Sequence, residues 1–243
     1  MFLAVWCFVV AFAGGLVGLV LGNIRLPVVV LVSASPAAGA GANIGISGVA
    51  AATASVAHIR AGRVNWRLFA WMAPPSVAGA IIGGLVSGAL PSGVLLAVIG
   101  TTLLYFGVDL VRTKHQSLPV GRGELDIRAA VVAGALIGLL GGLVGLILGA
   151  LRMPALLKYV GETPARAVGT NLTVGVCVGV AGLVGHLASG VDWTAFWIGA
   201  AASVPGALLG ARTTGRLAAA QLMRAIGVVL LIAGVSMLVQ AFV

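Results

Sequence analysis

Charged residues are scarce in this chain of 243 residues, because Asp, Glu, Lys and Arg make up only 8 % of it. A soluble domain carries about a quarter of its residues as charged side chains. Hydrophobic residues account for 60 % of the chain, and the mean hydropathy is +1.18. The shortage of charge excludes a soluble globular fold and predicts a protein that is solvated by lipid.

Several long stretches contain no charged residue at all. Each is close to the roughly 20 residues that a helix needs to cross a bilayer, and the longest could form two helices with a turn at 88–93. The apolar runs are continuous rather than alternating, which indicates helices. The sequence therefore predicts an all-α polytopic membrane protein with about eight transmembrane helices. The uncharged stretches are 3–22, 36–57, 68–108, 129–151, 167–185, 193–211 and 225–243.

Acidic residues and cysteines are the rarest chemistry-bearing groups. All five carboxylates fall at the ends of expected spans or in loops, so no buried acid is expected for a proton or sodium relay. The two cysteines lie far apart inside spans, which favours neither a disulfide framework nor a metal pair. We expect no cofactor and no metal. The residues are Asp109, Glu124, Asp126, Glu162 and Asp192, with Cys7 and Cys177.

The net charge of +9 comes from basic residues at the span ends. Lys and Arg at such positions meet lipid headgroups, so nucleic acid is not an expected partner.

With eight spans, the termini share a side of the membrane with loops 58–67 and 112–128. That side carries seven basic residues and the opposite side carries four, when Arg25, Arg152 and Arg166 are not counted because they are expected to lie deep in the membrane. The positive-inside rule then places both termini in the cytoplasm. The first span has no cleavage-like end, so we interpret it as retained.

The chain contains an internal repeat. Residues 14–27 return 127 residues later as 141–154, with ten of the fourteen positions identical. Further pairs keep the same order, so the match is a true repeat and not a chance similarity between Gly-rich helices. The further pairs are Gly41-Ala42-Asn43 with Gly169-Thr170-Asn171, His58 with His186, and Asn65-Trp66 with Asp192-Trp193.

The repeat divides the chain into a four-helix unit at 1–113, a polar linker at 114–127 and a second four-helix unit at 128–243. An even number of helices in each unit brings the second copy into the membrane from the same side as the first. The sequence therefore predicts two parallel repeats, unless the repeated motif is a half-spanning hairpin. Homo-oligomerisation is left open.

The repeated motif ends in Gly22–Pro27 and Gly149–Pro154. Proline lacks an amide hydrogen and disfavours helix in the residue before it, so each helix is expected to end or break at Pro27 and Pro154. Arg25 and Arg152 stand two residues before these prolines. A buried Arg without an acidic neighbour favours an anion site. The alternative is that both side chains extend to the headgroups from the helix ends.

Other polar residues of the repeat are candidates for the same site. Asn43 and Asn171 fall early in the next helices, where their amides could bind an anion or cap a helix. Thr170 could add a hydroxyl on one side only. His58 and His186 lie near the far ends of these helices, as a proton carrier or polar gate, or as hydrogen-bonded interfacial residues.

An enzyme is the first competing hypothesis. Gly45-Ile46-Ser47-Gly48 has the form of a nucleophile motif, and His186 could act as its base in an intramembrane serine protease. The repeat partner of Ser47 is Gly175, however, and a duplicated unit has no role in that chemistry. We therefore do not expect an enzyme. A membrane scaffold without transport activity is the second competing hypothesis.

The order of these motifs resembles the sulfite exporter TauE/SafE family of eight-helix permeases. The matching segments are 22–27 and 149–154, 40–43 and 167–171, and His186 to Trp193. The resemblance covers nearly the whole chain. It implies a permease in the bacterial inner membrane that moves sulfite, a sulfonate or a related organosulfur anion. The expected site lies between the two repeats, around Arg25, Pro27, Asn43, Arg152, Pro154, Thr170 and Asn171.

Overall fold

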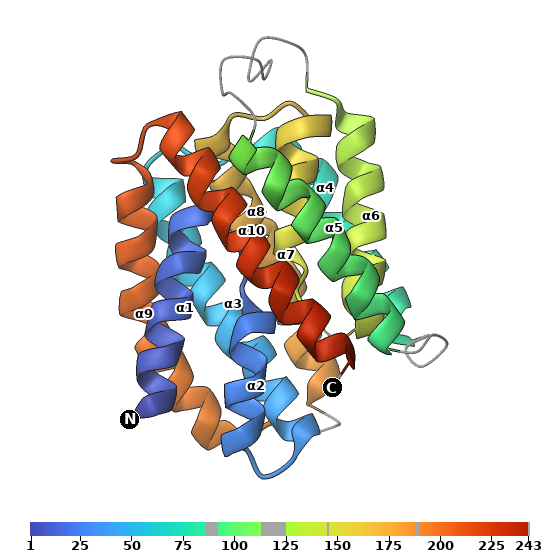
Figure 1. The fold of residues 1–243 in the computed structure, drawn as a ribbon, viewed down its shortest axis with the longest axis vertical. Helices are drawn as coiled ribbons and strands as arrows, with labels where there is room; N and C mark the ends of the chain where they lie inside the picture. The colour runs from blue at the N-terminus through green and yellow to red at the C-terminus, as the bar shows by residue number, and fades with distance from the viewer. Residues whose placement is uncertain (86–91, 113–124, 145, 188–189, 243) are drawn as a thin grey trace.

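A computed structural model describes residues 1–85, 92–112, 125–144, 146–187 and 190–242. These residues form ten α-helices and one π-helical turn, with no strand among them, and the helices pack side by side along the long axis (Figure 1). The elements are α1 (Phe2–Val17), α2 (Gly22–Val32), α3 (Pro36–Arg60), α4 (Trp66–Leu85), α5 (Ser92–Arg112), α6 (Ile127–Val144), α7 (Gly149–Pro154), η1 (Ala155–Tyr159), α8 (Pro164–His186), α9 (Trp193–Thr214) and α10 (Ala219–Phe242).

The first expected span is a helical hairpin rather than one helix. α1 stops at Gly18, whose φ of 72° is left-handed and suits a residue without a Cβ. Leu19 then donates its N–H to the carbonyl of Gly14 and turns the chain back. α2 runs beside α1 in the opposite direction, since the indole of Trp6 donates to Ile24 O at 3.4 Å. The interruption precedes the Arg and Pro of the motif.

The second copy is interrupted in the same way. Leu146 donates its N–H to Gly141 O, which repeats the bond of the first copy. α7 and η1 then return along α6, because Asp126 N–H donates to Val160 O across the open end of this hairpin. Each half of the chain therefore has five helical segments in the described residues, with α7 and η1 counted as one, and not four helices.

An odd number of segments inverts the second repeat. α3 and α8 are repeat partners and cross in opposite directions at the centre of the protein. A Cβ on Gly179 would lie 3.0 Å from Cα of Gly48, whereas a Cβ on Gly169 would lie 3.2 Å from Cβ of His58. The expectation of parallel repeats is therefore wrong, because the repeated motif is a hairpin that adds one reversal of the chain.

The same inversion relates the remaining helices. α5 packs antiparallel to α10, with Gly100 against Gly234 and Gly107 against Gly227. α1 packs in parallel with α9, and α4 packs in parallel with α6. The first helix of each repeat therefore packs against a helix of the other repeat. A Cβ on Gly138 would overlap the carbonyl oxygen of Ser76. Small residues thus let these helix backbones touch.

Proline does not break the first motif helix as expected. Pro27 lies inside α2, and the break comes at residues 18–21 instead. A helical proline leaves the carbonyl four residues earlier without its donor. That carbonyl belongs to Asn23, and it accepts a hydrogen bond from Nε2 of Gln240 at 3.3 Å. The second copy follows the expectation more closely, since α7 ends at Pro154 and continues as η1.

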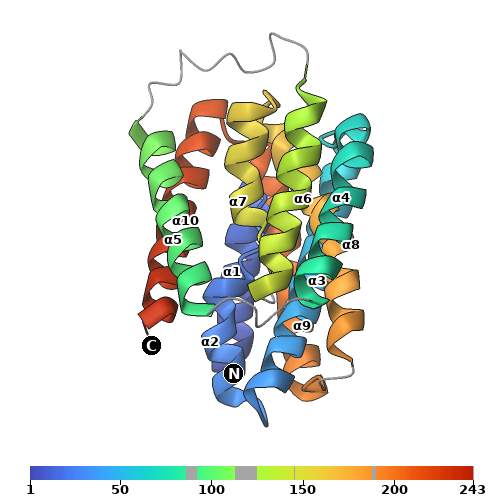
Figure 2. The same ribbon diagram turned by 90° about the vertical axis from the view of Figure 1, so that its right-hand side faces the viewer.

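The two ends of the protein differ in charge. Both termini lie at one end, and the start of α6 lies at the other (Figure 2). At that other end, Asn65 contacts Glu162, and Arg63 donates to Ala211 O. Ten described basic residues belong to helix ends and loops there, whereas Asp192 is the one described charged side chain at the terminal end. The basic residues are Arg60, Arg63, Arg67, Arg112, Arg128, Lys158, Arg166, Arg212, Arg216 and Arg224.

The termini therefore do not share a side with loop 58–67 or with the start of α6. The side assignment made from the sequence is wrong, because the α1–α2 hairpin returns the chain to its starting side before α3 begins. Four of the described helices are long and apolar enough to cross a membrane, namely α3, α8, α9 and α10. The number of eight spans stays a prediction. The expected turn at 88–93 and the linker at 114–127 lie mostly outside the described residues.

We predict that Gly138→Val will strongly destabilise the protein. The new side chain would overlap the carbonyl of Ser76 and force α4 and α6 apart, at a cost of several kcal/mol, about 3 or more. Thermal unfolding in detergent measures the change. The matched control is Gly185→Ala in α8, whose Cβ would meet nothing within 4 Å. Equal melting temperatures for the two variants would contradict close packing of α4 on α6.

Candidate functional site

Arg25 is buried beside the first helix break. Its side chain is 2 % exposed, and it is held by α3 through three hydrogen bonds. Nε donates to Asn43 Oδ1 at 2.9 Å, and Nη2 donates to Asn43 O at 3.1 Å and to the hydroxyl oxygen of Ser47. The amide of Asn43 in turn donates to Gly22 O at 3.0 Å. The motif Arg is thereby locked between the start of α2 and the middle of α3.

Arg152 occupies the matching place in the second repeat. It is 1 % exposed, and Nη1 donates to Asn171 Oδ1 at 3.1 Å. The amide of Asn171 donates to Gly149 O at 2.9 Å and also to Gly18 O at 2.6 Å. One asparagine therefore holds the interruptions of both repeats. Neither arginine reaches the protein surface, which does not fit side chains that extend to lipid headgroups.

The two interruptions lie against each other at the centre of the fold. A Cβ on Gly149 would lie 3.2 Å from the backbone nitrogen of Val20. Arg25, Asn43, Arg152 and Asn171 thus gather around the meeting point of the two repeated motifs. The sequence predicted this grouping, and it follows from the pairing of each Arg with the Asn that comes 18 or 19 residues later.

The arginines differ in how far the protein satisfies their donors. Nε of Arg152 is buried and has no hydrogen-bond partner in the part of the chain that the structure describes. In the first repeat the same nitrogen, Nε of Arg25, donates to Asn43 Oδ1, whereas Arg152 reaches Asn171 Oδ1 through Nη1. A buried charge is costly unless its hydrogen bonds are made. The pair of arginines is therefore chemically unequal, which the sequence analysis did not foresee.

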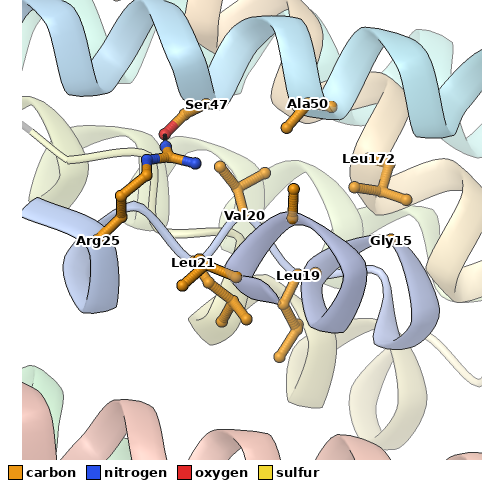
Figure 3. Close-up of a pocket in the computed structure, with 12 residues that line it drawn as sticks. Gly15, Leu19, Val20, Leu21, Arg25, Ser47, Ala50 and Leu172 are labelled. Carbon is orange, nitrogen blue, oxygen red and sulfur yellow. Dashed lines mark hydrogen bonds between the residues drawn. The ribbon is translucent and has the colours of Figure 1, made fainter. Parts of the chain in front are cut away.

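A small pocket adjoins the first of these arginines. Figure 3 shows the Arg25 guanidinium and the Ser47 hydroxyl together at one end, with Leu19, Val20 and Leu21 along the wall. Leu172, the residue after Asn171, belongs to the opposite part of the lining. Arg25 and Ser47 supply the polar side chains, and the rest of the lining is apolar or glycine. The pocket has room for about one water molecule.

A family comparison identifies the kind of protein that carries this arrangement. The model of the family described as sulfite exporter TauE/SafE matches residues 3–237, nearly the whole chain. The chain belongs to the TauE/SafE family. This family consists of membrane transporters for sulfur-containing anions. No curated protein and no solved structure matches the chain.

Thr170 does not join the arginines in this TauE/SafE protein. Its hydroxyl oxygen accepts the backbone N–H of Asn65 at 2.9 Å, at the basic end of the molecule. Asn65 also caps α4 through Leu68 N–H and donates to Glu162 Oε2 at 2.6 Å. Glu162 lies in a loop, as expected, but it is 3 % exposed, so one acid is buried, which the sequence did not predict. The side chain is buried because the tight loop before α8 folds it against Asn65.

The two histidines lie at opposite ends of the α3–α8 pair. His58 is fully buried, with Nε2 at 3.4 Å from Gly15 O, and its Nδ1 has no partner among the described residues. His186 is partly exposed, and its Nδ1 pairs with Gly182 O at 2.9 Å. Both are hydrogen-bonded to backbone carbonyls, and neither contacts Arg25 or Arg152. Their role as proton carriers or gates stays a prediction.

The protease hypothesis gains no support from the positions of its two residues. His186 lies against Gly41, and Ser47 is six residues further along α3, which is about 9 Å in a helix. The Ser47 hydroxyl pairs with a guanidinium, which cannot remove a proton. Ser47 is instead a residue of the arginine site that the sequence analysis missed. The Arg25–Ser47 contact joins two helices, and no local pattern signals it.

We predict that Asn171→Leu will destabilise the protein more than Asn43→Leu. The first change removes the partner of Arg152 and two bonds to the helix breaks, whereas the second removes one bond to a break. Each lost buried bond costs about 1–3 kcal/mol. Melting temperatures in detergent test the order. A larger loss for Asn43→Leu would show that Asn171 does not hold the two breaks together.

Proposed function

We propose that this protein is a permease that moves a small sulfur-containing oxyanion, such as sulfite or a sulfonate, through a central site between its two repeats. The observation that carries the proposal is a pair of buried guanidinium groups at the meeting point of the two helix breaks, without a carboxylate in contact with either among the described residues. An anion would neutralise this positive charge.

The chemistry of the site favours an oxyanion. Guanidinium N–H groups form charge-assisted hydrogen bonds with carboxylate and phosphate oxygens, and sulfite and sulfonate oxygens have the same acceptor character. Arg152 keeps an N–H group that the protein leaves unpaired. Inverted repeats with interrupted helices place transporter substrates near the midplane, where the repeats meet. Here that place lies between the Arg25–Asn43 and Arg152–Asn171 pairs.

A carboxylate near the two arginines would favour transport coupled to a cation. Among the described residues, no carboxylate lies near them. Asp109 pairs with Lys158, Glu162 with Asn65, and Asp192 caps α9, all away from the two arginines. The bond from Ala195 N–H lowers the pKa of the Asp192 carboxyl, which therefore stays ionised at neutral pH. This arrangement supports anion flux without sodium symport.

We predict that Arg25→Gln and Arg152→Gln, singly and together, will abolish or strongly lower anion flux. A hydrogen bond to a charged group contributes about 1.5–3 kcal/mol, so each change should lower kcat/KM about tenfold or more. Uptake of radiolabelled sulfite into proteoliposomes measures this. Arg212→Gln, at the exposed end of α9, is the matched control and should transport normally. Wild-type flux in the double variant would contradict a central arginine site.

The orientation in the membrane is a further part of the proposal. The ten basic residues at one end outnumber those at the end with the termini, where no described Lys or Arg lies. The positive-inside rule favours the basic end as cytoplasmic. We infer that both termini lie on the outer side of the bacterial inner membrane, opposite to the orientation expected from the sequence.

We predict that single cysteines at the two ends will differ in labelling. In a variant with Cys7 and Cys177 replaced by Ser, Ala34→Cys should react with a membrane-impermeant maleimide on intact spheroplasts. Arg216→Cys should react only after the membrane is opened. Both positions are exposed, so access to reagent depends on sidedness. The reverse labelling pattern would contradict the proposed orientation.

A further inference from the structure

Ser47 has a hydroxyl hydrogen without an acceptor in the described residues. Serine and threonine inside a helix usually donate to the carbonyl four residues earlier. Thr53 does so to Val49 O, and Thr173 to Gly169 O, each at 2.8 Å. For Ser47 the corresponding carbonyl belongs to Asn43 and accepts from Nη2 of Arg25 instead. Ser47 therefore appears in the structure only as an acceptor, and from the same guanidinium.

The free donor of Ser47 lies at the pocket. Its side chain is 2 % exposed and belongs to the pocket lining, together with Arg25. Figure 3 shows one guanidinium nitrogen at the Ser47 oxygen and another turned into the pocket beside Val20. No acceptor for Nη1 of Arg25 is present among the described residues, which leaves an N–H group next to the free hydroxyl.

The absence of a side chain at Gly22 allows the start of α2 to lie close to Ser47. A Cβ at Gly22 would lie 2.9 Å from the Ser47 oxygen, so a larger residue would push the hydroxyl out of place. In the second repeat Gly175 replaces Ser47, and a hydroxyl is missing beside Arg152. The two halves therefore offer an anion different numbers of side-chain donors.

We propose that Ser47 is a substrate-binding residue, which together with Arg25 forms a two-donor clamp for the oxygens of an –SO₃ group. This proposal rests on the proposed function and deepens it. Nη1 of Arg25 and the Ser47 hydroxyl each bind one oxygen, while Nη2 keeps the two side chains aligned. The pocket in its present form holds about one water molecule, so substrate enters only when Leu19–Leu21 move.

The test compares four proteins in proteoliposomes with radiolabelled inorganic sulfite, namely wild type, Ser47→Ala, Ser47→Thr and Ser55→Ala. Ser55 lies two turns further along α3, is 3 % exposed and has a hydroxyl without a partner, but it does not line the pocket. Ser55→Ala therefore matches Ser47→Ala in helix, burial and chemistry. Melting temperature and gel filtration report the folding of each variant.

We expect Ser47→Ala to raise the KM for sulfite about tenfold or more while the maximal flux changes little, because one bond to a charged ligand is lost. Ser47→Thr keeps the hydroxyl and should recover most of the affinity, and Ser55→Ala should match wild type. A purely structural role of Ser47 would lower the melting temperature and the amount of active protein without raising KM, and that result would overturn the proposal.

Ser47→Gly, which copies the second repeat, provides a second variant if Ser47→Ala fails to fold. An unchanged KM in a folded Ser47 variant, with flux still lost in Arg25→Gln, would contradict the two-donor clamp. The proposal of an anion permease would be unaffected by that result. Absence of flux for sulfite and for methanesulfonate in the wild-type protein would instead count against the permease itself. The two failures are therefore distinguishable.

Discussion

The burial of two guanidinium groups is the constraint on which the centre of this fold depends. Each charge needs acceptors in the interior of the protein, and the chain supplies them from Asn43 and Asn171. The amide of each Asn is then fixed by a backbone carbonyl at a helix break, Gly22 O or Gly149 O. Breaks, asparagines and arginines form one unit, because removal of any member leaves the others with unpaired polar groups.

Glycine makes this polar unit compatible with tight packing. The breaks of the two repeats touch where Gly149 faces Val20, and α3 crosses α8 at Gly48 and Gly179. Around this centre, α1 packs on α9 and α4 on α6, so each repeat is completed by a helix of the other. Such an exchange ties the two halves together. Residues 19–21, which follow the Gly18 turn, line the pocket.

Much of the candidate site was predictable, because a duplicated sequence marks the polar positions that recur in both of its copies. Arg25, Arg152, Asn43 and Asn171 stood out as polar residues kept in an apolar repeat, and the structure brings them together. Thr170 was misjudged, since helical position alone does not say which neighbour a side chain meets. Ser47 was seen as a nucleophile and not as a partner of Arg25, because that contact links residues on separate helices.

Composition and the repeat by themselves determined that this is a helical membrane protein, that it has two related halves, and which polar residues recur in both of them. Hydropathy indicates which residues are buried in lipid or protein, but it does not indicate the direction of the chain. The reversal at Gly18 and the inverted repeats were therefore decided only by the tertiary structure. The same reversal moved the termini away from the basic end of the molecule. The inequality of Arg25 and Arg152 also needed the fold, since a hydrogen-bond donor is satisfied or left free only by atoms that packing brings to it.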